Sequence, residues 1–119
     1  MMERDVERRL VELARRHGGV ALKWTSPGTL GVPDRLLFMP DGRLWLVELK
    51  RPGGRPRNSQ KAMHRRLARL GWPVYVVDDA DRFFAGTVLL AADVADKGAG
   101  AEDKGDVEDA GDGAGVRRR

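Results

Sequence analysis

Hydrophobic residues along the first 90 positions switch between helical and strand spacing. Between residues 4 and 17, Val6, Leu10 and Leu13 recur every three or four positions, as on one face of an amphipathic helix, and Gly18 follows. Short apolar runs bounded by turn residues indicate strands. The pattern predicts strands at residues 20–26, 34–39, 43–50 and 73–77, a helix at 59–70 opened by Asn58 or Ser59, and a short helix at 80–90.

Turn residues indicate how two of these strands pair. Asp41-Gly42 follows one strand and precedes the next, which is the signature of a hairpin, so residues 34–39 and 43–50 should lie antiparallel. The expected order is α-β-β-β-α-β. We therefore predict an α/β domain with a mixed sheet flanked by helices.

The last part of the chain has a different composition. After about Ala95 it consists mainly of Gly, Ala, Asp, Glu and Lys, with no aromatic residue. Such a segment buries too little apolar surface to offset its ordering entropy. We predict one domain at residues 1–94 and a disordered, acidic and glycine-rich tail at 95–119.

The strand at residues 43–50 ends in charged residues. Strand alternation places Leu46, Glu48 and Lys50 on one face and Val47 and Leu49 on the other. Asp34 begins the antiparallel neighbour, and the beginning of one strand lies beside the end of the other. Asp34, Glu48 and Lys50 should therefore meet at one end of the sheet.

Two neighbouring carboxylates repel each other unless a cation neutralises them. The chain has no cysteine, which excludes a thiolate site, and two histidines are too few for a histidine-rich site, so a hard cation on oxygen ligands fits better. Mg²⁺ or Mn²⁺ on two carboxylates can activate water for phosphodiester hydrolysis, and a neighbouring lysine can orient that water or offset phosphate charge. Glu7 and Gln60 each border an apolar helical stripe, and we expect both to point at this sheet end.

Basic residues concentrate directly after this strand. Between positions 50 and 69 there are eight Lys or Arg and no Asp or Glu, although the whole chain carries a net charge of only +4. Such a stripe is a plausible footprint for a phosphate backbone, or simply a solvated surface. The residues expected to contact nucleic acid are Arg51, Arg55, Arg57, Lys61 and Arg65.

These motifs together resemble the VRR-NUC domain of the PD-(D/E)xK nuclease superfamily. The resemblance covers about residues 3–80 and rests on Glu7, residues 26–28 (Ser-Pro-Gly), residues 31–34 (Gly-Val-Pro-Asp), residues 48–50 (Glu-Leu-Lys) and Gln60. It implies a restriction-endonuclease-like core and Mg²⁺- or Mn²⁺-dependent cleavage of DNA, including branched DNA, by a homodimer. It also implies metal ligation by Asp34, Glu48 and the Leu49 carbonyl, catalysis by Lys50, and supporting roles for Glu7 and Gln60.

Simpler interpretations exist for each motif. A Glu-x-Lys pair on a strand is usually a surface ion pair, and the chain could be a non-catalytic nucleic-acid-binding protein or an RNase. We interpret His17 and His64 as structural or surface residues, and the aspartates at 78, 79 and 81 as helix caps. Trp72, Phe83 and Phe84 are candidates for a dimer contact or for the monomer core. Without a long apolar run or a secretory signal, a cytoplasmic protein with no membrane partner is expected.

Overall fold

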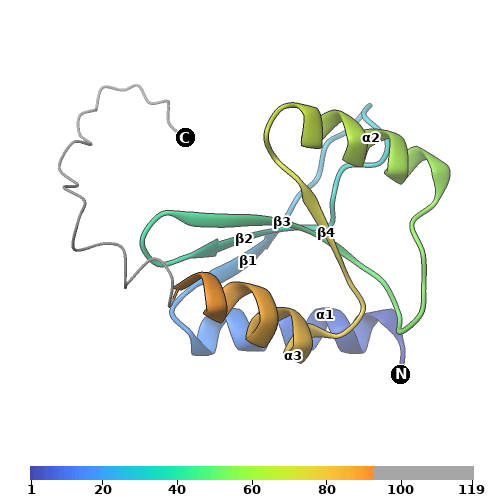
Figure 1. Ribbon diagram of the computed structural model, residues 1–119. Coiled ribbons are helices and arrows are strands. Elements are labelled where there is room, and N and C mark those ends of the chain that lie inside the picture. Colours follow the sequence, from blue (N-terminus) through green and yellow to red (C-terminus); the bar gives the residue numbers. More distant parts are fainter. Residues whose placement is uncertain (93–119) are drawn as a thin grey trace, which may run out of the picture.

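The computed structural model describes residues 1–92, and the predicted tail lies outside the described residues. The element order agrees with the order expected from the sequence (Figure 1). The helices are α1 (Glu3–Arg16), α2 (Asn58–Arg69), α3 (Ala80–Phe83) and the π-helical turn η1 (Phe84–Val88); the strands are β1 (Val20–Lys23), β2 (Arg35–Met39), β3 (Arg43–Leu49) and β4 (Val74–Val77). None of the helices formed by residues 1–92 has the length and apolarity needed to cross a membrane.

The four strands form one mixed sheet in the order β1-β2-β3-β4. β1 pairs antiparallel with β2 and β2 with β3, whereas β3 and β4 are parallel. The β2–β3 connection is the expected hairpin, and Asp41 and Gly42 both have positive φ, which Asp and Gly tolerate better than most residues. The parallel pair follows because β4 is reached by a crossover through α2. β3 therefore lies inside the sheet, with its end flanked by β2 and β4.

Helices lie on both faces of the sheet, in three layers (Figure 1). α1, α3 and η1 cover one face and enclose the hydrophobic core with the inward residues of every strand. Phe83 and Phe84 are 8% and 2% exposed in this core, so of the two roles expected for them the structure supports the monomer core and not a dimer contact. They close the monomer core because α3, which begins after the Asp79 cap, packs against α1.

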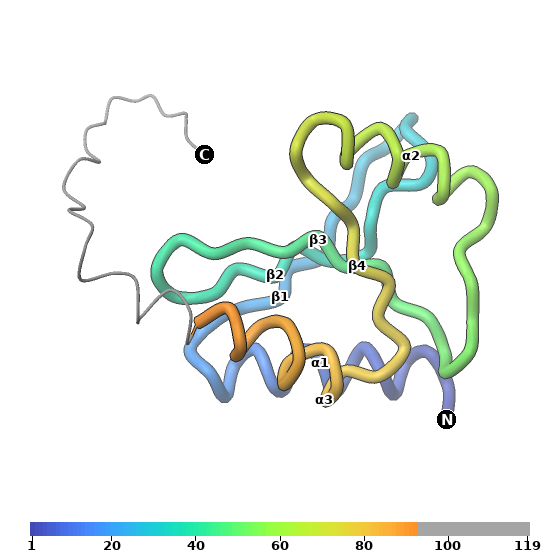
Figure 2. Tube along the Cα trace, viewed as in Figure 1, coloured from blue at the N-terminus to red at the C-terminus, as the bar shows by residue number. Residues whose placement is uncertain are grey.

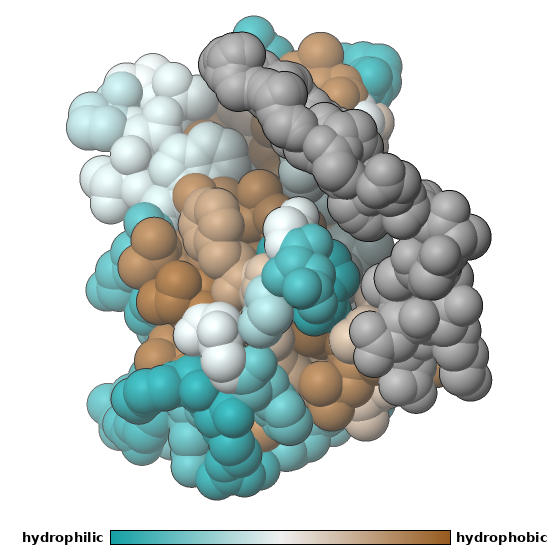
Figure 3. Space-filling view, turned by 90° about the vertical axis from the view of Figure 1, so that its left-hand side faces the viewer, coloured by the Kyte–Doolittle hydropathy of each residue, from teal (hydrophilic) through white to brown (hydrophobic). Residues whose placement is uncertain are grey.

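α2 lies on the opposite face but contacts mainly β4. The rest of that face is apolar and partly open, and Val20, Leu22 and Phe38 are 46%, 49% and 40% exposed. Figure 3 shows hydrophobic side chains gathered between hydrophilic rims on the side of the molecule that carries the hairpin. This face therefore has two regions: a polar cluster beneath α2 and an apolar area beyond it.

Most element ends lie within one residue of the sequence expectations, the helix expected at 80–90 is divided into α3 and η1, and two further ends differ in ways that the hydrogen bonds describe. β1 ends at Lys23, before the predicted end at residue 26, although Trp24 N–H still donates to Asp34 O. α2 begins at Asn58 with Arg57 as its N-cap, so neither predicted capping residue is correct. The backbone of Arg57 is extended, and its N–H donates to the side chain of Gln60 at the third helical position, as in one half of a capping box.

Candidate active site

Asp34 lies directly before β2, beside the end of β3. One oxygen, Oδ2, accepts a hydrogen bond from the peptide N–H of Leu49 at 2.8 Å. The carboxylate thus bridges from the start of one strand to the end of the next, as the antiparallel hairpin requires. This bond leaves Oδ1 available for another partner and brings the Asp34 charge beside Glu48.

Glu48 and Lys50 point from β3 toward α2, as strand alternation predicted. Glu48 is 1% exposed, and the Lys50 ammonium Nζ lies 3.6 Å from Glu48 Oε2. Lys50 is itself buried, and its peptide N–H donates to Val77 O, which holds its backbone against β4. A buried carboxylate and a buried ammonium are therefore locked into adjacent positions at one end of a central strand.

Gln60 approaches the same carboxylate from the first turn of α2. Its Oε1 accepts the Arg57 N–H at 2.8 Å, so its amide NH₂ must face the other way, where Nε2 donates to Glu48 Oε2 at 2.8 Å. Gly31 lets the backbone before β2 approach this turn closely: its φ is +84°, and a Cβ there would collide with Ser59 O. Figure 2 shows the segment between β1 and β2 rising to meet α2.

His64 is the site residue that sequence reasoning missed. Its Nε2 lies 3.5 Å from Glu48 Oε1, and its side chain is 14% exposed. It points toward Glu48 and not into solvent, because it follows Gln60 by one helical turn and lies on the same face of α2. That i, i+4 spacing from a predicted site glutamine was the signal that could have identified it.

The surroundings of Glu48 destabilise its ionised form. Burial, and then repulsion from Asp34, raises its pKa from 4.5 to about 7, while Lys50 opposes part of the rise. Burial and Lys50 lower the pKa of His64, whereas Asp34 acts in the opposite direction. In the absence of a cation, ionising both carboxylates is therefore unfavourable near neutral pH.

These residues fit a hard divalent cation. Glu48 Oε1 is a buried oxygen without a hydrogen-bond partner among the described residues, and Asp34 is close enough for its charge to raise the pKa of Glu48. No group of three or more His, Cys, Asp or Glu side chains suited to a metal is found within residues 1–92. Two carboxylates still suffice for Mg²⁺, which usually keeps several waters and takes one or two protein carboxylates.

Known proteins share this architecture. No protein-family model matches the chain. A phage protein named "Putative nuclease p44" (Acyrthosiphon pisum secondary endosymbiont phage 1) is 46% identical over 79 residues, which are 66% of this chain and 85% of that protein. A solved structure described as "VRR_NUC domain" superposes with a TM-score of 0.66 at 29% identity, covering 71% of this chain and 96% of that one. The chain belongs to the VRR-NUC family.

Glu7 of this VRR-NUC protein points toward the start of β2, directly after Asp34. It lies on α1, and its Oε2 accepts two hydrogen bonds from Arg35, at 3.0 Å from Nε and 2.8 Å from Nη2. Arg35 also donates to Ala21 O. These bonds tie α1 to the start of β2 and do not reach Glu48 or Lys50.

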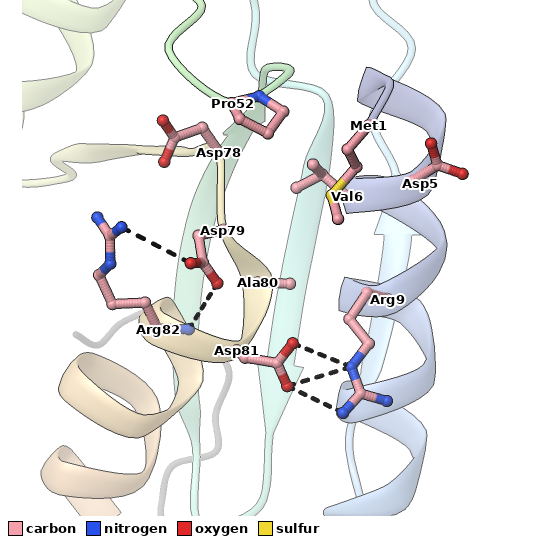
Figure 4. A pocket seen from close by; sticks show the side chains of 10 residues that line it. All are labelled: Met1, Asp5, Val6, Arg9, Pro52, Asp78, Asp79, Ala80, Asp81 and Arg82. Atoms are coloured by element: carbon pink, nitrogen blue, oxygen red, sulfur yellow. Dashed lines mark hydrogen bonds and ion pairs between the residues drawn. The ribbon is translucent and has the colours of Figure 1, made fainter.

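A pocket on the α1 side of the VRR-NUC core does not contain this chemistry. It has a volume of about 600 Å³ and lies where α1, the loop after β3 and the start of α3 meet (Figure 4). Four of its charged side chains pair with each other: Arg9 with Asp81, and Arg82 with Asp79, which also caps α3. Asp78 accepts the Gly53 N–H and anchors the loop. The pocket is therefore held by structural ion pairs on the face opposite Glu48.

The predicted basic residues all lie on the surface of the VRR-NUC domain. They occupy the loop from β3 to α2 and exposed positions of α2, a stretch of chain that Figure 2 shows leading away from β3. Lys50 itself is buried and belongs to the cluster. The exposed residues are Arg51, Arg55, Arg57, Lys61 and Arg65.

Proposed function

We propose that this VRR-NUC protein is a Mg²⁺- or Mn²⁺-dependent DNA endonuclease that hydrolyses phosphodiester bonds and selects DNA by shape. The observation that supports this best is the burial of Glu48 and Lys50 together beside Asp34. A buried carboxylate whose pKa is raised costs stability. A purely binding protein has no use for such an arrangement, whereas a cation site that hydrolyses phosphodiesters needs it.

Each residue of the cluster takes a distinct part. Asp34 Oδ1, Glu48 Oε1 and the Leu49 carbonyl would hold the cation. When bound there, a cation would supply an activated water and would neutralise charge on the phosphate. Lys50 is placed to orient the attacking water and to stabilise negative charge as it develops on the phosphate oxygens. Gln60 holds the Glu48 carboxylate through Oε2.

Shape selection follows from what the domain offers to DNA. The exposed basic surface beside the site is suited to a phosphate backbone, which is the same for every sequence. Residues 1–92 include no recognition helix joined to a second helix by a short turn, so the helix-turn-helix means of reading base edges is missing from them. Cleavage should therefore depend on the geometry of the duplex.

A cleavage assay tests this function directly. The full chain should be incubated with linear, nicked, flapped and four-way-junction DNA of the same sequence, and with the matching RNA, in Mg²⁺, in Mn²⁺ and in EDTA. We expect metal-dependent cleavage that is faster on branched than on linear DNA. Absence of cleavage on every substrate would contradict the proposed nuclease activity. Faster cleavage of RNA would show that RNA, and not DNA, is the preferred substrate.

The basic surface leads to a prediction about salt dependence. The double variant Arg55→Ala/Arg65→Ala should bind all DNA sequences more weakly, and the slope of log Kd against log salt should fall by about 2, because each lost phosphate contact removes about one released counterion. Fluorescence anisotropy at about 50 to 300 mM salt measures both the affinity and the slope. The matched control is Arg4→Ala/Arg15→Ala, which removes the same charge from exposed positions on α1. An equal effect of both double variants would show that only net charge matters.

A homodimer would supply the two active centres that cutting both strands of a junction requires. The open apolar area on the α2 side is the surface we assign to the second copy. Val20 and Phe38 are paired across strands, and Leu22 lies beside them in the next row, so three exposed apolar side chains are contiguous. A patch of this kind on a small domain is typical of an interface.

Light scattering at micromolar concentration should therefore report a dimer for the full chain. The double variant Leu22→Glu/Phe38→Glu should be monomeric, because a second copy would have to bury four carboxylates per dimer. Leu30→Glu/Leu70→Glu is the control, since Leu30 and Leu70 are exposed but lie outside the strands of the sheet. A monomeric wild-type chain would refute the dimer and leave the nuclease assignment intact.

A further inference from the structure

Two buried polar atoms face each other between α2 and β3. Glu48 Oε1 and His64 Nε2 are both inaccessible to solvent and both lack a hydrogen-bond partner among the described residues. They lie 3.5 Å apart. Buried polar atoms are nearly always hydrogen-bonded, so each of these two is the natural partner of the other.

Helix geometry explains why His64 is there. His64 follows Gln60 by four residues, so both side chains leave α2 on the same face. Gln60 Nε2 already donates to Glu48 Oε2 at 2.8 Å, and His64 Nε2 lies against the other oxygen, Oε1. One helix thus presents one nitrogen to each oxygen of the same carboxylate.

We propose that His64 is a positioning residue whose Nε2–H donates to Glu48 Oε1 and, together with Gln60, fixes the orientation of the Glu48 carboxylate toward the cation. The inference rests on the proposed metal-dependent function. A carboxylate oxygen has two lone pairs, so Oε1 can accept this hydrogen bond and still ligate a cation. Hydrogen bonds to ligating carboxylates commonly tune metal affinity in this way.

The proposal specifies the tautomer of the metal-free protein. If His64 donates through Nε2, the proton resides on Nε2 and Nδ1 is bare, whereas a histidine that ligates through Nε2 carries its proton on Nδ1. Two-dimensional ¹⁵N–¹H NMR of the full chain in EDTA distinguishes the two states. We expect the Nε2–H form, with a resonance that shifts in the Glu48→Gln variant. The Nδ1–H form would overturn the proposal.

Metal affinity provides the second test. In calorimetric titration with Mn²⁺, His64→Leu should bind about 10–100-fold more weakly than wild type. His64→Gln retains an N–H donor at a similar distance along the side chain and should recover most of the affinity. His17→Leu is the matched control, since His17 stacks on Phe84 at the far end of α1. In cleavage assays at limiting Mn²⁺, His64→Leu should lower kcat and leave the KM for DNA unchanged.

The outcomes separate this inference from the function on which it rests. Wild-type affinity in His64→Leu, or equal losses in His64→Leu and His64→Gln, would refute the positioning role. Circular dichroism and the melting temperature of each variant exclude unfolding as the cause of a loss. A wild-type chain that binds no Mn²⁺ would instead refute the metal-dependent nuclease, and the tautomer measurement would still decide the His64–Glu48 hydrogen bond.

Discussion

The Lys50→Met variant should cleave DNA about 10²–10⁴-fold more slowly than the wild-type chain, with its fold intact. Lys50 is buried beside Glu48, and methionine preserves the apolar stem that packs there while removing the ammonium. Loss of that group removes both the orientation of the attacking water and the stabilisation of charge on the phosphate. Single-turnover cleavage at saturating Mn²⁺ measures the chemical step without contributions from product release.

Two further measurements make this test specific. Lys50 lowers the pKa of Glu48, so its removal should raise that pKa further, and both proteins should be compared over a pH series above 7 so that protonation of Glu48 is told apart from loss of catalysis. Lys23→Met is the matched control, because Lys23 is exposed on β1 and belongs to no part of the site. A wild-type rate in Lys50→Met would refute the proposed catalytic role of the lysine.

Glu48→Gln should abolish cleavage and yet make the metal-free chain more stable at pH 8. The pKa of Glu48 is raised from 4.5 to about 7 in the folded state, first by burial and then by Asp34. Between these values the folded chain holds a proton that the unfolded chain has released, so stability falls as pH rises through this window. Above pH 7 the full penalty remains, on the order of 3 kcal/mol. Glutamine never ionises and avoids it.

Urea unfolding in EDTA from pH 4 to pH 8.5 measures this difference. The free energy of unfolding of Glu48→Gln should match that of wild type near pH 4 and exceed it increasingly up to about pH 7. Saturating Mn²⁺ at pH 8 should reverse the order, since it binds the folded wild-type chain and not the variant. A metal-free variant that is less stable than wild type at pH 8 would show that ionised Glu48 is well solvated or fully compensated.

The strand and hairpin patterns by themselves determined the centre of the site. Alternation in residues 43–50 fixed the face shared by Glu48 and Lys50, and Asp41-Gly42 fixed the hairpin that brings Asp34 alongside. These relations are local: a strand has a period of two residues and a tight turn leaves little freedom in the register, so neighbouring residues suffice to define them.

The long-range partners of helical residues were decided only by the tertiary structure. Helical spacing showed that Glu7 borders an apolar stripe but not that Arg35, 28 residues away, would bond it. Likewise it could not show that His64 would lie against Glu48, or that Phe83 and Phe84 would close the core against α1. A helix's periodicity defines which side chains share a face, whereas the element that this face meets depends on the crossover direction and packing of the whole sheet.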